Sequence, residues 1–270
     1  MPARSQDRWH YCTVPATGHG DVVQQSTWWL ARSVDLTPDT DDWLTTAERT
    51  YADRQRYTKR RTEFRVARFT AKSAIALALG LPRDPAALAT IEIRHESSGA
   101  PYACVDGRPI DRQLSLTDRA DWAVCLLGSG ASRIGCDLEL VEPRSAAFVH
   151  DFFTTDEQQY VARCGVTIGR DLGANLIWSA KESALKVLTT GLRRDTRSVE
   201  VRPDRGDGAW GRLSIDTIEG ATLHGWWRRY GSFVLTTASS EPAAAPSSLE
   251  VRSLLETAIP THGWVHEPLR

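Results

Sequence analysis

The chain has 270 residues, of which 41% are hydrophobic, and its formal net charge is -1. This composition allows one large domain or two smaller ones, each with a buried core. The near-zero charge excludes a global basic field for nucleic acid, so any anion site has to be local.

The cysteines and the apolar runs argue against two further classes of protein. There are 5 cysteines, an odd number, and no CxxC pair, so we expect reduced thiols rather than a disulfide scaffold or a zinc site. The longest apolar runs, such as residues 74–79, are too short to cross a bilayer. We therefore expect a soluble cytoplasmic protein that binds neither a membrane nor nucleic acid.

The first half of the chain predicts an irregular start, a strand, a long helix and further strands. Residues 1–26 are polar and mixed, which indicates an irregular N-terminus. The pattern over residues 53–79 is helical, and Gly80 and Pro82 end it. Strands are predicted over residues 28–36, 91–94, 113–116 and 122–127.

The second half has the same order of predicted elements. Residues 133–141 predict a strand, and residues 148–162 predict a helix whose main part begins at Thr154. A second helix is expected over residues 176–188, closed by Gly191. Further strands are predicted near residues 198–201, 211–215, 222–230 and 232–236.

This order predicts an α/β (α+β) fold with two lobes. We expect an N-terminal lobe over residues 27–130 and a C-terminal lobe over residues 131–238. Residues 239–248 are rich in Pro, Ala and Ser, which indicates a linker. The tail, residues 249–270, could dock as a short helix.

Two short segments carry the candidate chemistry. Asp137 and Glu139 alternate along the predicted strand, so their carboxylates leave the same face. Glu182 and Lys186 are four residues apart on the predicted helix and also share a face. If the faces meet, three carboxylates could hold a hard cation such as magnesium, beside a base and a lysine. Each motif alone is more often a polar strand edge or a solvated pair, but together they favour phosphoryl-type transfer.

The same segments resemble a known family. Residues 135–139 read Gly-Cys-Asp-Leu-Glu, and residues 178–186 read Trp-Ser-Ala-Lys-Glu-Ser-Ala-Leu-Lys. With Phe152, Phe153 and Glu157 between them, they resemble the core of the surfactin-type 4'-phosphopantetheinyl transferases. That family has Gly-x-Asp, a gap, and then Trp-Ser-x-Lys-Glu-Ala/Ser-x-x-Lys.

The resemblance extends more loosely over residues 28–237 and implies a fold and an activity. The fold would be that of the family, with two pseudo-twofold-related lobes, each with an antiparallel sheet and a long helix. The N-terminal lobe would lie on the coenzyme A side, and the C-terminal lobe would carry the metal and catalytic residues. The enzyme, a monomer, would use magnesium to move the 4'-phosphopantetheine arm of coenzyme A to a serine of an acyl or peptidyl carrier protein. The other product would be 3',5'-ADP.

By position, the resemblance assigns roles to the candidate residues. Asp137, Glu139 and Glu182 would be the magnesium ligands. Glu182 would also be the base for the carrier serine, and Lys186 would assist the departure of 3',5'-ADP. The residues that would shape the site or contact coenzyme A are Trp178, Lys181, Arg65, Gly99, Pro101, Thr117 and Arg119.

Two positions depart from the family pattern where the coenzyme would bind. The family's Gly-Lys-Pro is Gly-Ala-Pro at residues 99–101, and Asp118 stands where the family has a histidine. An aspartate beside a phosphate would disfavour binding by roughly several kcal/mol at a dielectric of about 20. The nearby cations that could compensate are Arg108, Arg112 and Arg119.

These departures leave two alternatives to the transferase. The fold and metal site could serve another diphosphate-containing substrate or another reaction. The protein could also be a non-catalytic relative that binds carrier proteins or coenzyme A.

Overall fold

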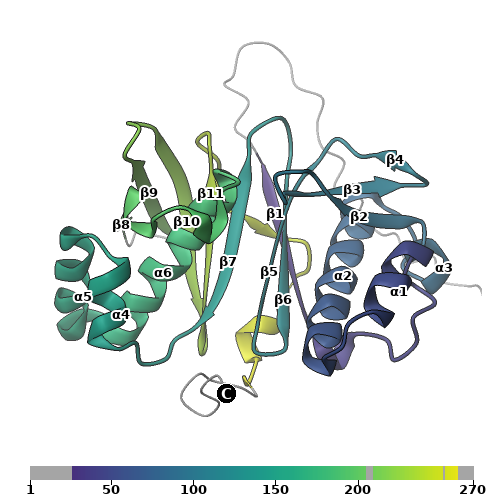
Figure 1. The fold of residues 1–270 in the computed structure, drawn as a ribbon, viewed down its shortest axis with the longest axis horizontal. Coiled ribbons are helices and arrows are strands. Elements are labelled where there is room, and N and C mark those ends of the chain that lie inside the picture. The colour runs from purple at the N-terminus through teal and green to yellow at the C-terminus, as the bar shows by residue number, and fades with distance from the viewer. Residues whose placement is uncertain (1–25, 205–208, 252, 261–270) are drawn as a thin grey trace, which may run out of the picture.

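A computed structural model describes residues 26–204, 209–251 and 253–260, which form a mixed α+β fold with three sheets (Figure 1). The first sheet has the spatial order β12 (Ser247–Ser248), β1 (Thr27–Ser33), β6 (Trp122–Gly128) and β5 (Gln113–Arg119). The second has the order β7 (Ile134–Leu140), β11 (Phe233–Ser239), β10 (Thr222–Tyr230), β9 (Gly211–Thr217) and β8 (Val199–Asp204). A small third sheet contains β2 (Ile91–His95), β3 (Pro101–Val105) and β4 (Arg108–Pro109). All pairs are antiparallel except β1 with β12, so the predicted α+β class is confirmed.

The helices flank these sheets on two sides (Figure 1). Those of the first half are α1 (Thr46–Asp53), α2 (Thr58–Leu79) and α3 (Pro85–Leu88). Those of the second half are α4 (Ala146–Phe152), α5 (Thr155–Thr167) and α6 (Arg170–Val187). Short 3-10 turns occur at Val34–Leu36, Gly191–Arg193, Thr196–Ser198 and Leu254–Thr257. In the described part of the chain, no helix is long and apolar enough to cross a membrane.

One predicted helix begins later in the structure, and another is divided. The helix predicted over residues 53–79 is α2, which begins only at Thr58, because the residues just before it are mostly exposed and bury nothing that would extend the helix. The helix predicted over residues 148–162 is α4 and α5. Here Phe153 is buried in extended backbone, and Thr154 begins a new helix through a capping box with Glu157.

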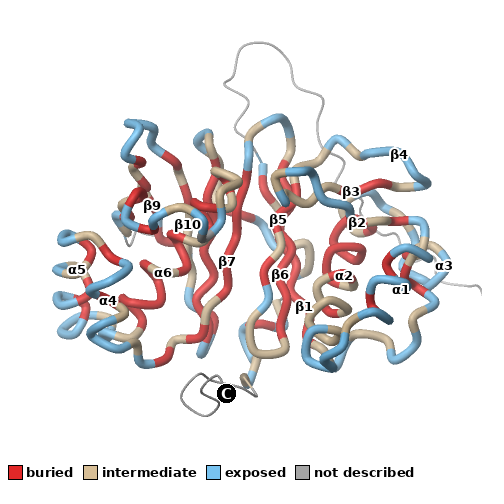
Figure 2. Tube along the Cα trace, in the orientation of Figure 1, coloured by how far each residue is buried: buried red, intermediate tan, exposed pale blue. Residues whose placement is uncertain are grey.

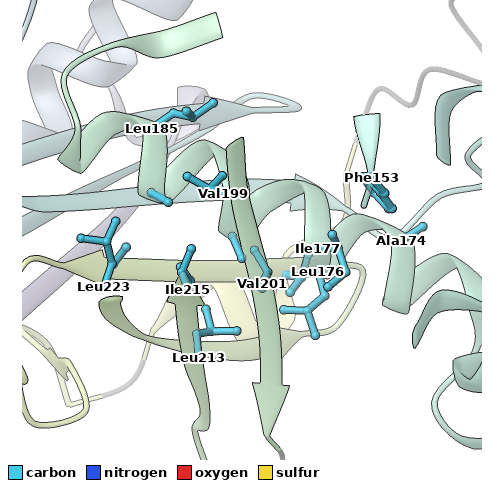
Figure 3. Close-up of a cluster of buried hydrophobic side chains, with 14 of the residues drawn as sticks. Phe153, Ala174, Leu176, Ile177, Leu185, Val199, Val201, Leu213, Ile215 and Leu223 are labelled. Atoms are coloured by element: carbon cyan, nitrogen blue, oxygen red, sulfur yellow. The ribbon is translucent and has the colours of Figure 1, made fainter. Parts of the chain in front are cut away.

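Three clusters of buried apolar side chains join the layers. Figure 2 shows buried residues, in red, along β5, β6 and β7 and in α2 and α6. The cluster between α2 and the first sheet includes Leu30, Ala71, Ile75, Cys125 and Leu127. The cluster shared by both sheets includes Trp29, Trp122, Cys136, Leu138 and Phe233. The cluster under α6 includes Ile177, Leu185, Val201 and Ile215 (Figure 3). The helices therefore pack on the outer faces, and the sheets share an inner core.

The two large sheets meet where β5 lies beside β7. The backbone N–H of Cys136 donates to Ser115 Oγ at 3.0 Å, and the N–H of Leu138 donates to Thr117 Oγ1 at 3.3 Å. Moving two residues along β5, from Ser115 to Thr117, moves the contact two residues forward along β7, from Cys136 to Leu138. The two strands therefore run in the same direction. Side-chain hydroxyls thus join the edges of the sheets in place of a backbone ladder.

A buried ion pair anchors α6 to the second sheet. Lys181 Nζ lies 2.8 Å from a Glu157 carboxylate oxygen and donates to the carbonyls of Thr196 and Val199. The other Glu157 oxygen accepts from the N–H of Val201 at 2.8 Å. One lysine therefore ties together α5, α6 and β8.

The same arrangement recurs at α2. Lys72 Nζ lies 2.6 Å from Glu48 and donates to the carbonyls of Trp43 and Leu88. Glu48 also accepts from the N–H of Ile93 and closes a capping box. The spacing of Glu48 and Lys72 equals that of the second pair. This repeat supports a relation between the halves, while the pseudo-twofold lobes and their boundaries stay predictions.

Residues 239–248, expected to be a linker, run along the first sheet instead, because two of them form β12 beside β1. In the segment that follows, Glu250 pairs with Arg32 at 2.5 Å, and Leu255 is fully buried in the cluster shared by the sheets. This part of the tail therefore covers the core. The predicted irregular start up to residue 25 and the end of the tail, residues 261–270, lie outside the described residues.

Candidate functional site

Asp137 occupies the centre of the candidate site, on β7. Only 7% of the residue is exposed. Its Oδ1 accepts hydrogen bonds from Lys186 Nζ and Thr117 Oγ1, both at 3.0 Å. Its Oδ2 is buried and has no hydrogen-bond partner among the described residues. A buried carboxylate oxygen of this kind is expected to have a partner, so it is the natural place for a ligand.

Gly135 lets α6 approach β7 closely enough to build this site. A Cβ at this position would lie 2.0 Å from the backbone carbonyl oxygen of Ser183, a distance that no real contact allows. The close approach lets Lys186 Nζ donate to the Cys136 carbonyl at 2.7 Å, and Ser179 Oγ donate to the Asp137 carbonyl at 3.1 Å. The glycine is therefore required by space rather than by its backbone angles.

Glu182 and Lys186 lie one turn apart on α6, as predicted, and both are half-buried. Burial raises the pKa of Glu182 to about 7, the Asp137 charge adds to the rise, and Lys186 opposes it. Burial acts to lower the pKa of Lys186, but Asp137 outweighs it, and the net shift is upward. Glu182 is thus a weakly acidic carboxyl suited to accept a proton near neutral pH.

Glu139 shares the face of Asp137, but arginines occupy its carboxylate. Its Oε2 lies 3.2 Å from Arg119 Nε and 3.1 Å from Arg144 Nη2. Arg119 also pairs with Glu142 at 2.5 Å. Burial raises the pKa of Glu139 to about 7 and Asp137 adds to the rise, while Arg144 and Arg119 act against it.

The predicted set of three carboxylate ligands stays a prediction, because Glu139 is paired with arginines in this arrangement. Among the residues that the structure describes, no group of three or more His, Cys, Asp or Glu side chains could hold a metal ion. The free Oδ2 of Asp137 and the carboxylate of Glu182 still suit a hard cation, which prefers oxygen ligands and keeps waters and substrate phosphates. Glu139 does not suit it in this arrangement, because both arginines already neutralise its charge.

A cavity of about 1340 Å³ opens beside Lys186. It runs from the β2–β3 turn across the start of β5 to the end of α6, so it touches both large sheets. Known small-molecule sites reach roughly 1,000 Å³, so this cavity can take an elongated ligand. Its charged and histidine residues are Arg68, His95, Glu96, Asp111, Arg112, Asp118, Arg133, Lys186 and Arg193.

Of the residues expected at coenzyme A, Gly99 and Pro101 line this cavity. Gly99 has a φ of 92°, which the tight β2–β3 turn requires. Thr117 and Arg119 do not line the cavity; their side chains hold Asp137 and Glu139 respectively.

Two other residues expected to contact coenzyme A bind other parts of the protein instead. Lys181 is fully buried against Glu157, so the structure gives it a structural position rather than one that faces the coenzyme. Arg65 pairs with Asp41 at 2.8 Å and donates to carbonyls of residues 38–40, so it holds the loop before α1. Neither side chain lines the cavity.

The two departures from the family pattern both lie on the cavity wall. Ala100 brings no charge. The Asp118 side chain is open to the cavity, yet the surrounding walls raise its pKa to about 6 by burial, and the like charge of Glu63 on α2 adds to the rise. Of the three arginines considered as compensation, Arg112 lines the cavity, whereas Arg119 is paired elsewhere and Arg108 is not part of the lining.

Sequence reasoning missed Arg133 and Arg193 of the cavity and Arg144 at Glu139. Arg133 immediately precedes the predicted strand of the motif, which is the signal that could have found it. Trp178, expected to shape the site, packs edge-on against Phe148 with ring centres 4.9 Å apart.

No curated protein matches the chain. A crystal structure of holo-[acyl-carrier-protein] synthase from Thermotoga maritima is similar at 22% identity, over 49% of this chain and 75% of that one. The TM-score of this similarity is 0.29. Residues 133–238 match the model of the 4'-phosphopantetheinyl transferase superfamily, and this stretch holds Asp137, Glu139, Glu182 and Lys186.

Proposed function

We propose that the protein transfers the 4'-phosphopantetheine arm of coenzyme A to a serine of an acyl or peptidyl carrier protein, in a magnesium-dependent reaction. The observation that carries this proposal is the contact of Lys186 and Asp137, with Glu182 one turn away, at the edge of a cavity large enough for an elongated ligand. These residues lie in the stretch that matches the superfamily model. The surfactin-type subgroup stays a prediction.

Each residue of the site has a part in this reaction. Asp137 and Glu182 would hold magnesium, which when bound neutralises charge on the diphosphate. Glu182 accepts the proton of the carrier serine, in keeping with its raised pKa. The serine oxygen bonds to the phosphorus that carries the pantetheine arm, and the bond from that phosphorus to the bridging oxygen breaks. The bridging oxygen leaves on 3',5'-ADP with the electron pair, and Lys186 stabilises its charge.

The test is to incubate the protein with coenzyme A, magnesium and several apo carrier proteins, and to weigh the products. We expect one carrier to gain the mass of a single phosphopantetheine. Glu182→Gln should lower the rate by about 10²- to 10⁴-fold, the range for loss of a general base. Glu219→Gln is the matched control, because that glutamate is exposed and its carboxylate pairs with Arg194.

Two outcomes would contradict the proposal. Full activity of Glu182→Gln would remove the proposed base. Coenzyme A binding without a mass gain on any carrier would favour the non-catalytic alternative. The monomeric state and the cytoplasmic location stay predictions.

A further inference from the structure

The positions expected to hold the nucleoside end of coenzyme A carry the wrong charge in this chain. Ala100 supplies no cation. Asp118 adds a negative charge to the cavity wall, and Glu63 acts on it as a like charge, while Lys186 and Arg60 act on it as opposite charges. A phosphate beside Asp118 would be repelled, so a phosphate-bearing ligand needs cations on another part of the cavity wall.

An arginine directly precedes each of β5 and β7, the strands at which the two large sheets meet. The hydrogen bonds of Ser115 with Cys136, and of Thr117 with Leu138, align the two strands in the same direction with a constant offset. The same offset places Arg112, just before β5, beside Arg133, just before β7.

Packing at the start of the two strands supports this placement. A Cβ added at Gly128 would lie 3.2 Å from the Ile134 side chain and 3.5 Å from the Gln113 Cβ, so both residues pack at Gly128. Arg112 and Arg133 directly precede these two residues, and both line the cavity.

Both guanidinium groups have donors to spare. Arg112 Nη1 donates to the adjacent Asp111 carbonyl at 2.9 Å, while its Nε is buried and lacks a hydrogen-bond partner among the described residues. Arg133 is exposed, and its Nη1 makes one long contact of 3.5 Å with Thr189 Oγ1. Neither is in an ion pair with a carboxylate of the described part of the chain. Arg193 lines the same cavity on the turn after α6.

This arginine pair lies apart from Asp137, Glu182 and Lys186, the residues proposed to meet the diphosphate. Arg133 precedes Asp137 by four residues, which is roughly 13 Å along an extended strand. The side chain of an arginine can cover part of that span, so the pair can meet a second phosphate one sugar ring away from the diphosphate. Arginine suits a terminal phosphate because its planar donors bind two oxygens at once.

We infer that Arg112 and Arg133 form the binding site for the phosphate monoester at the nucleoside end of the substrate, the 3'-phosphate of coenzyme A. This inference rests on the proposed function. It assigns the terminal phosphate to the wall formed by the starts of β5 and β7, away from Asp118.

The experiment compares coenzyme A with 3'-dephospho-coenzyme A by titration calorimetry. We expect the wild type to bind coenzyme A at least about a hundredfold more tightly, as two charge-assisted hydrogen bonds would give. R112Q/R133Q should lose this preference because coenzyme A alone binds more weakly. R108Q is the matched control, since Arg108 lies on β4 outside the cavity lining, and it should keep the preference. If the double variant does not fold, R133Q alone serves, because that side chain is exposed.

Three results would overturn the inference: no preference in the wild type, an unchanged preference in R112Q/R133Q, or equal weakening of both compounds. The carrier mass assay separates this from the proposed function. A preference that the arginine variants abolish, without transfer to any carrier, keeps the phosphate site and contradicts the transferase. A wild type that binds neither compound contradicts both.

Discussion

Replacing Lys181 with methionine tests whether this lysine supports the fold or the coenzyme. Its ammonium group is fully buried, 2.8 Å from Glu157, and it donates to the carbonyls of Thr196 and Val199. Methionine fills a similar space but leaves the Glu157 charge and both carbonyls without this partner. Removing one partner of a buried ion pair costs about 3–5 kcal/mol, so we expect the free energy of unfolding to fall by that amount.

The assay is urea unfolding followed by tryptophan fluorescence. The midpoint should fall while the slope stays the same, since the surface exposed on unfolding does not change. Lys72→Met is the matched control, because Lys72 makes the equivalent ion pair with Glu48. The free energy of unfolding of this variant should fall by a similar amount. The double variant Lys181→Met/Glu157→Gln should regain part of the free energy of unfolding that Lys181→Met loses, because it leaves no unpaired buried charge.

Coenzyme A titration decides between the two roles. We expect folded Lys181→Met to bind coenzyme A as the wild type does, because the side chain does not line the cavity. A variant with wild-type stability and weakened coenzyme A binding would refute this reasoning, and would favour the coenzyme contact that the family resemblance implies.

Three further predictions concern the site and the core. Gly135→Ala should lower stability by about 3 kcal/mol and abolish transfer, because the methyl would meet the Ser183 carbonyl at 2.0 Å and push α6 away; wild-type melting and activity would contradict this. Leu255→Ala should lower the free energy of unfolding by about 2–5 kcal/mol, measured in urea, because this side chain is fully buried; a loss near zero would mean that the segment does not cover the core. Asp137→Asn should weaken Mn²⁺ binding, followed by electron paramagnetic resonance, more than Glu139→Gln does, because two arginines already neutralise Glu139; equal losses would show that both are ligands.

The short-range features of the site were predictable from the sequence because they depend on local geometry. Alternation along a strand puts Asp137 and Glu139 on one face, and helical spacing puts Glu182 and Lys186 on another. The two faces do meet, as the contact between Lys186 and Asp137 shows. The α+β class followed in the same way from the order of the periodic segments.

Long-range pairing was not predictable in this way. Lys181 belongs to the same short motif as Glu182, yet its partner Glu157 lies on another helix, and burial commits it to the interior. Glu139 meets arginines from β5 and from the loop before α4, and no spacing along the strand indicates that.

The sequence by itself therefore determined which groups share a face, since neighbouring residues obey fixed helical and strand periods. Only the tertiary structure decided which of those groups remain free for a ligand. That choice depends on charges brought together from distant segments, and a buried charge takes whichever partner the packing places beside it. Within the described part of the chain, one carboxylate oxygen of Asp137 has no hydrogen-bond partner, while Lys181 and Glu139 are held in ion pairs.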